Sequence, residues 1–214
     1  MKILVIGATG GTGREIVKQA LRAGHEVTAI VREQPQSEEM LNGAKLVVGD
    51  ARDKEALRRA LAGQDAVADS LGSSMSGPFK EVHLFSESTK ALIEAMQAEN
   101  VRRLICITGI GAGDSQGHGG FLYDHFVQPV LLRGVYEDKN RQEELIQASG
   151  LDWIIVRPAM LSDGEPAGGT LAITDLSDFH GGSIRRADVA AFVVEQMTSN
   201  EWLHKHPLIF HKGA

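Results

Sequence analysis

The sequence has little of what builds covalently linked or metal-held folds. Its 214 residues include one cysteine, Cys106, which lies inside an apolar run. Neither a disulfide framework nor a zinc cluster of thiolates can therefore form, and we expect a reducing compartment. His204, His206 and His211 resemble a metal cluster only in composition, because they straddle a predicted strand without a carboxylate in register. We expect no metal site.

Long hydrophobic runs and excess positive charge are also missing. No stretch approaches the roughly 18 consecutive apolar residues of a membrane span, and the chain begins in an apolar run without a charged leader. We therefore expect a cytoplasmic protein that does not bind membranes. The formal net charge is -6, and the basic doublets Arg102-Arg103 and Arg185-Arg186 are short and isolated. This charge pattern argues against a nucleic-acid partner.

Short apolar runs alternate with amphipathic segments along the chain. We expect strands at residues 3–6, 26–31, 45–48, 66–68, 104–108, 153–156 and 208–210, and helices from about 12, 53 and 80, before 149 and at 187–197. Helical crossovers between strands imply a parallel sheet covered on both faces. The pattern predicts an α/β, doubly wound Rossmann fold in one domain over residues 1–214, with a small C-terminal extension on the substrate side.

Two segments interrupt this alternation, at residues 109–127 and 158–183. Both follow predicted strands at their carboxyl ends, where open α/β sheets bind ligands. Long connections in a compact domain are commonly functional. We predict that they form the walls of a substrate site.

A glycine-rich turn joins the first predicted strand to the first helix. Gly7 allows the sharp turn, Gly10 allows backbone to approach a pyrophosphate, and Gly13 allows the helix to lie close to the sheet. The helix N-terminus then presents unpaired N–H groups to the anion. The pattern predicts dinucleotide binding by Gly7, Thr9, Gly10, Gly11, Thr12 and Gly13.

The end of the second strand indicates which dinucleotide is preferred. An acidic residue there would bind the ribose hydroxyls of NAD, but the sequence has Arg32. A guanidinium can hold a 2′-phosphate through paired N–H donors, so we predict NADP(H) in preference to NAD(H). Glu33 is close enough to leave NAD(H) as the alternative, and a solvated Arg32 is the other.

The chain resembles a known family over nearly its whole length. The resemblance rests on the glycine turn and on Val31-Arg32, Val48-Gly49-Asp50, Ser149 to Trp153, Val156-Arg157-Pro158 and Arg186 to Ala190. In this order these motifs are similar to an atypical short-chain dehydrogenase/reductase. Within that family the chain is similar to the NAD(P)H-binding group of NmrA-like proteins and biliverdin-IXβ reductase, also called flavin reductase.

The resemblance implies roles for further residues. They are Asp50 and Ala51 at the adenine, Leu71, Gly72 and Ser73 beside the nicotinamide-side ribose, Thr108 in the active site, Lys139 at the ribose hydroxyls, and Pro158, Ala159 and Met160 as the wall of the nicotinamide. Active members of the wider superfamily carry Tyr-x-x-x-Lys, whereas here Tyr136 precedes Lys139 by three positions. Tyr136 is thus a candidate acid that is out of register, and the alternative is that it covers the helix start. For Lys139 the alternative is an exposed ion pair with Glu143.

These features predict an NADPH-dependent reductase that passes hydride to a small planar or carbonyl acceptor, such as a flavin or a quinone. The proton would come from water or a loop side chain. One alternative is a non-enzymatic NADP(H) sensor or regulator, which the displaced Tyr136 favours. The other is an epimerase or dehydratase of the nucleotide-sugar type. We expect a small-molecule substrate and a monomer or homodimer.

Overall fold

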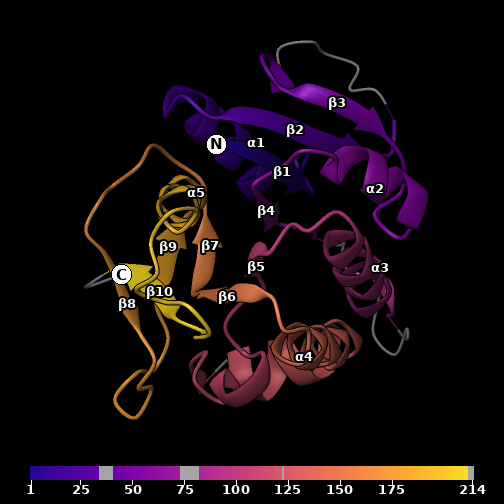
Figure 1. The fold of residues 1–214 in the computed structure, drawn as a ribbon. Helices are drawn as coiled ribbons and strands as arrows, with labels where there is room; N and C mark the ends of the chain where they lie inside the picture. The colour runs from indigo at the N-terminus through magenta and orange to yellow at the C-terminus, as the bar shows by residue number, and fades with distance from the viewer. Residues whose placement is uncertain (34–40, 73–81, 122, 212–214) are drawn as a thin grey trace.

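The computed structural model describes residues 1–33, 41–72, 82–121 and 123–211. Ser73, predicted at the nicotinamide ribose, lies outside these residues. Within them, eight strands form one sheet in the order β3-β2-β1-β4-β5-β6-β10-β8 (Figure 1). The strands are β1 (Lys2–Ile6), β2 (Glu26–Val31), β3 (Lys45–Val48), β4 (Ala66–Asp69), β5 (Arg103–Ile107), β6 (Asp152–Pro158), β8 (Thr170–Ile173) and β10 (Leu208–His211).

The strands are parallel except at one edge, where β8 pairs antiparallel with β10. Five helices cover the sheet in the described part of the chain: α1 (Gly11–Arg22), α2 (Lys54–Leu61), α3 (Leu84–Ala98), α4 (Arg133–Gln147) and α5 (Arg186–Glu195). One apolar cluster joins α1 and α5 to one face. A second joins α2, α3 and α4 to the other. The doubly wound Rossmann fold is confirmed. None of the described helices is long and apolar enough to cross a membrane.

The segments predicted as irregular connections contain more regular structure than we expected. A π-helix spans Tyr123–Leu131, and the short strands β7 (Met160–Ser162) and β9 (Ser183–Arg185) pair with each other in a separate ribbon. Strands of three or four residues carry almost no periodic signal in a sequence. The connection between β7 and β8 is held to α5, where the carboxylate of Asp188 accepts from the backbone N–H groups of Ala167 and Gly168.

The start of the third helix also differs from the prediction. We expected a helix from about residue 80, but residues 82 and 83 are not helical and α3 begins at Leu84. Its first turn is held by Asp138 of α4, which accepts from the backbone N–H groups of Phe85 and Ser86. A cap supplied from another helix leaves no local pattern in the sequence.

Candidate active site

A cavity of about 700 Å³ opens at the carboxyl ends of β1, β2, β4 and β5. It lies where the strand order reverses between β1 and β4, the position at which doubly wound sheets bind their ligands. The described residues that line it include most of the predicted set: Gly7, Thr9, Gly10, Gly11, Thr12, Arg32, Asp50, Ala51, Leu71, Gly72, Thr108 and Lys139.

The glycine turn forms the floor of the cavity. Gly7 has φ +75°, and a Cβ on it would lie 2.5 Å from the Ser70 carbonyl oxygen on the neighbouring turn. A Cβ on Gly13 would overlap the Gly7 carbonyl, so this glycine sits beneath the turn and packs α1 against it. Gly10 caps α1, whose first turn contains no acidic residue. The free N–H groups of that turn therefore face the cavity without a competing carboxylate.

Charged groups surround one end of the cavity. Asp50 accepts from the Arg52 side chain through Nε and Nη2, both at 3.0 Å, and from the Arg52 backbone at 2.8 Å. The Arg52 hydrogen bonds, supported by the charge of Arg32, lower the pKa of Asp50 to about 2. Asp50 is therefore ionised at neutral pH and can accept from an adenine amine. Arg32 lines the same end.

Lys139 lies at the other end, inside the protein. Its side chain is buried, its Nζ is 3.5 Å from the Ile107 carbonyl oxygen, and it stands 4.4 Å from the centre of the Phe85 ring. Burial lowers the pKa of this ammonium group. The alternative of an exposed ion pair between Lys139 and Glu143 is wrong, because both side chains are buried and the Glu143 carboxylate pairs with Arg157.

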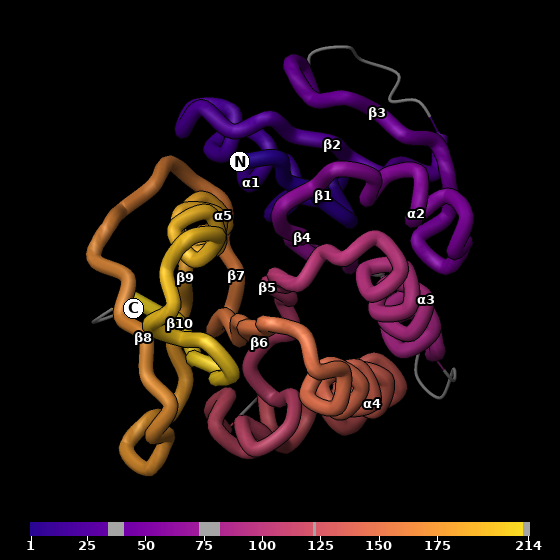
Figure 2. Tube along the Cα trace, viewed as in Figure 1, coloured from indigo at the N-terminus to yellow at the C-terminus, as the bar shows by residue number. Residues whose placement is uncertain are grey.

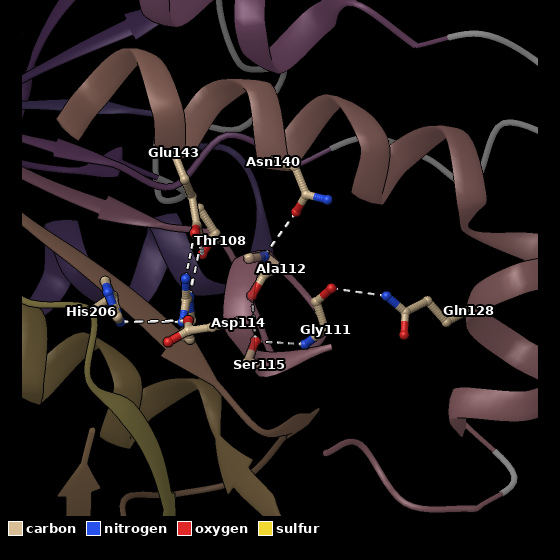
Figure 3. A network of polar contacts seen from close by, with 11 residues as sticks. Thr108, Gly111, Ala112, Asp114, Ser115, Gln128, Asn140, Glu143 and His206 are labelled. Carbon is tan, nitrogen blue, oxygen red and sulfur yellow. Dashed lines mark hydrogen bonds and ion pairs between the residues drawn. The ribbon is translucent and has the colours of Figure 1, made fainter. Parts of the chain in front are cut away.

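A chain of polar contacts runs from Thr108 away from the cavity (Figure 3). The Thr108 hydroxyl donates to Glu143 Oε1 at 2.6 Å, and Arg157 donates to both oxygens of the same carboxylate. Arg157 also contacts Asp114 and His206 toward the surface. Because the hydroxyl hydrogen is used by Glu143, the Thr108 oxygen presents its lone pairs to the cavity as an acceptor.

Hydrogen bonds to nearby side chains fix the turn that follows β5, at residues 109–116. Gly111 accepts from the Gln128 side chain and its N–H donates to Ser115, while the Gly113 N–H donates to Asn140 of α4 (Figure 3). These contacts join residues 109–116 to α4 and to the π-helix. None of the described residues within 109–127 lines the cavity, so the substrate wall predicted there stays a prediction.

Tyr136 does not line the cavity; Val135, its neighbour, does. The Tyr136 hydroxyl forms a hydrogen bond with Tyr123 of the π-helix. Burial raises the pKa of Tyr136, so the phenol holds its proton more tightly than usual. A three-residue spacing leaves Tyr136 and Lys139 near one face of α4. The phenol is nevertheless engaged by Tyr123, and of the two residues Lys139 alone lines the cavity.

The three residues predicted at the nicotinamide wall, Pro158, Ala159 and Met160, also lie outside the lining. Pro158 ends β6, and the Met160 side chain points outward and is 59% exposed. Leu161, the next residue of β7, lines the cavity instead. Neighbouring residues of a strand point to opposite faces, so Leu161 faces the cavity and Met160 faces away from it. A strand as short as β7 has too few residues for its sequence pattern to show which face is which.

Other residues of the site were not predicted from the sequence. Arg52, Phe85, Leu132 and Arg186 line the cavity. Asp69, which is buried at the end of β4, accepts from the Leu71 N–H and holds that turn in place. Arg52 is two residues after the family motif that ends at Asp50, and Arg186 begins the motif at residues 186–190. Their nearness to these motifs could have indicated a role in the site. Phe85 lies in α3 and Leu132 caps the start of α4, and only the tertiary fold brings these two residues here.

The fold and the glycine-lined cavity define a Rossmann domain built to hold a dinucleotide. The model of the NAD(P)H-binding family matches residues 7–200, and the chain belongs to this family. The family predicted from the motifs is thus confirmed.

Three similar proteins illustrate the range of the matches. The photosystem II assembly factor Ycf39 of Cyanophora paradoxa is 32% identical over 158 residues, 73% of this chain and 44% of the relative. The chain therefore spans less than half the length of the Ycf39 proteins that it matches. The uncharacterized sugar epimerase YhfK of Bacillus subtilis is 28% identical over 92% of this chain and 88% of its own. ChuY of Escherichia coli O157:H7, described as an anaerobillin reductase, has a TM-score of 0.84 at 22% identity, over 100% of this chain and 98% of that one.

Proposed function

We propose that this protein is an NADPH-dependent oxidoreductase that transfers hydride to a small planar or carbonyl acceptor, with flavins and quinones preferred over sugars. The observation that carries the proposal is the contrast between the two ends of the cavity. Arg32, Asp50 and Arg52 gather at one end. The apolar side chains Leu84, Phe85, Leu132, Val135 and Leu161 line the cavity elsewhere.

The cavity fits a reduced dinucleotide. The absence of Cβ atoms at Gly7 and Gly13 lets the turn close tightly, and the first turn of α1 presents its N–H groups to a pyrophosphate. Reduced nicotinamide supplies the hydride when it is bound. The protein supplies binding, orientation and the exclusion of water.

Four further residues of the cavity lining have proposed tasks. Lys139 holds the ribose hydroxyls, and its buried charge favours an acceptor that gains electrons. Thr108, with its hydrogen given to Glu143, accepts a hydrogen bond from the bound molecule. Leu161 and Val135 bound the acceptor and exclude water. The proton for the reduced acceptor comes from water or from a loop side chain.

A flat apolar acceptor matches this lining better than a sugar does, because each buried sugar hydroxyl would need a polar partner. The absence of Tyr136 from the described lining favours one second candidate, a non-enzymatic NADP(H) sensor. The two are separated by mixing the purified protein with NADPH and a panel of FMN, menadione and simple ketones. We expect the reduced-nicotinamide absorbance to fall with FMN or menadione. Binding of NADPH without oxidation by any acceptor would favour the sensor.

A further inference from the structure

We propose that Arg186 binds the pyrophosphate of the dinucleotide and that Asp163 is its counter-ion while the cavity is empty. The inference rests on the proposed placement of the dinucleotide along the glycine turn. It does not depend on the acceptor. It assigns a task to the motif at residues 186–190, for which neither the predicted site nor the proposed reaction has a use.

The fold carries Arg186 to the phosphate turn from a distant part of the sequence. Arg186 is the first residue of α5, and α5 packs beside α1 on the same face of the sheet. The starts of the two helices lie together, since Gly11, the first residue of α1, is next to the Arg186 side chain. In Figure 2 the trace passes from β9 directly into α5, next to β7.

The missing side chain of Gly11 provides the space for Arg186. A Cβ on Gly11 would lie 2.8 Å from Arg186 Cδ and 3.0 Å from Nε. The arginine side chain therefore crosses directly over the backbone of the turn, and it lines the cavity together with Gly10 and Thr12. A guanidinium in this place faces the same anion as the N–H groups of α1.

Asp163 holds the guanidinium by a contact that is easily exchanged. β7 pairs with β9 so that Ser162 is opposite Arg185, and the residues that follow them, Asp163 and Arg186, form an ion pair at 2.8 Å. The Asp163 side chain is 90% exposed, so water screens this pair and makes it weak. Bidentate hydrogen bonds to a phosphate can replace it.

Arg186 and Arg32 would then have separate tasks. Arg32 faces the adenosine end, where NADPH and NADH differ, whereas Arg186 lies over the turn that binds the part common to both. Loss of Arg186 should weaken the two cofactors by the same factor, and loss of Arg32 should change their ratio.

The test is equilibrium binding of NADPH, NADH and adenosine 2′-monophosphate to the full chain and its variants. We expect Arg186→Met to weaken NADPH and NADH equally, by roughly 10- to 100-fold, as for a lost hydrogen bond to a charged group. Binding of adenosine 2′-monophosphate, which has no pyrophosphate, should be unchanged. Arg186→Lys should lose less, and Asp163→Asn should tighten both cofactors.

The neighbouring Arg185 provides a matched control, because its Nη1 donates to the Glu165 carbonyl and it does not line the cavity. Arg185→Met should bind all three ligands like the wild type. The proposal is overturned if Arg186→Met binds NADPH as tightly as wild type, or if it weakens adenosine 2′-monophosphate as much as NADPH. A wild type that binds neither cofactor overturns it together with the proposed function. If the wild type binds NADPH through Arg186 but none of the acceptors oxidises the bound NADPH, only the proposed reductase activity is overturned.

Discussion

Thr108 and Glu143 form a buried hydrogen bond of 2.6 Å that connects the cavity to an ion pair inside the protein. Glu143 and Arg157 are each 2% exposed, and their contact is 2.6 Å. Removing one partner of such a pair leaves an uncompensated buried charge. The ion pair therefore positions the Thr108 hydroxyl. Loss of either partner should lower the free energy of unfolding more than the loss of an exposed charged residue would.

Glu143→Ala should accordingly destabilise the protein by about 3 to 5 kcal/mol, measured as the free energy of unfolding in urea. Glu137→Ala is the matched control on the same helix, because Glu137 pairs with Arg133 in an exposed i,i+4 contact. That variant should lose less than about 1 kcal/mol. Equal losses of unfolding free energy in the two variants would mean that the buried network stabilises the protein no more than an exposed ion pair does.

Gly7→Ala should be more damaging than Gly24→Ala, although both glycines have positive φ, +75° and +82°. A Cβ on Gly24 has nothing within 4 Å, so it suffers only the backbone strain of about 1 to 2 kcal/mol. A Cβ on Gly7 also collides with the Ser70 carbonyl. We expect a larger loss of unfolding free energy in urea and the loss of NADPH binding. Similar stability in the two variants would contradict the close contact of the two turns.

Arg32→Ala should weaken NADPH by about 1.5 to 3 kcal/mol while leaving NADH unchanged, because only NADPH carries the 2′-phosphate. Titration calorimetry with both cofactors measures this difference. Arg22→Ala, at an exposed position in the last turn of α1, is the control and should change neither affinity. If wild type binds NADH as tightly as NADPH, the assignment of the 2′-phosphate to Arg32 fails.

Lys139 predicts an unusual pH dependence of stability. Burial lowers its pKa in the folded protein below the ordinary 10.5, so the unfolded chain takes up a proton more readily than the folded one. This contribution to stability is greatest above pH 10.5 and is lost as the pH falls through the folded pKa.

Lys139→Met should therefore be at least as stable as wild type at pH 7, with an advantage that shrinks as the pH rises toward 10.5. The Lys139→Met variant should also oxidise NADPH more slowly than the wild type does. Urea unfolding of both proteins across this pH range is the measurement. A variant that is less stable at pH 7 would show that the carboxylates near Lys139 outweigh its burial.

Tyr136→Phe should keep its rate of NADPH oxidation within about twofold, since the phenol is engaged by Tyr123 and lies outside the described cavity lining. The lost hydrogen bond should cost about 0.5 to 1.5 kcal/mol of stability. A large fall in rate without a change in cofactor affinity would instead identify Tyr136 as the acid.

Local signals in the sequence predicted the parts of the site that depend on neighbouring residues. The glycine turn follows from a short pattern, and so does the start of α2 near residue 53, where the Asp53 carboxylate accepts from the backbone N–H groups of Glu55 and Ala56. The cap of α3 by Asp138, 53 residues away from Phe85, and the bond between Thr108 and Glu143 depend on helix packing. The same holds for Arg186 over Gly11. No spacing in a single sequence records such contacts.

The most direct test of the proposed function is single-turnover oxidation of protein-bound NADPH by menadione, followed at the reduced-nicotinamide band. We expect the band to decay faster on the protein than in free solution, and more slowly when nicotinamide C4 carries deuterium at the transferred position. The Thr108→Val variant should show a slower decay of the band than the wild-type protein. Tight binding of NADPH with no protein-dependent decay would contradict the account.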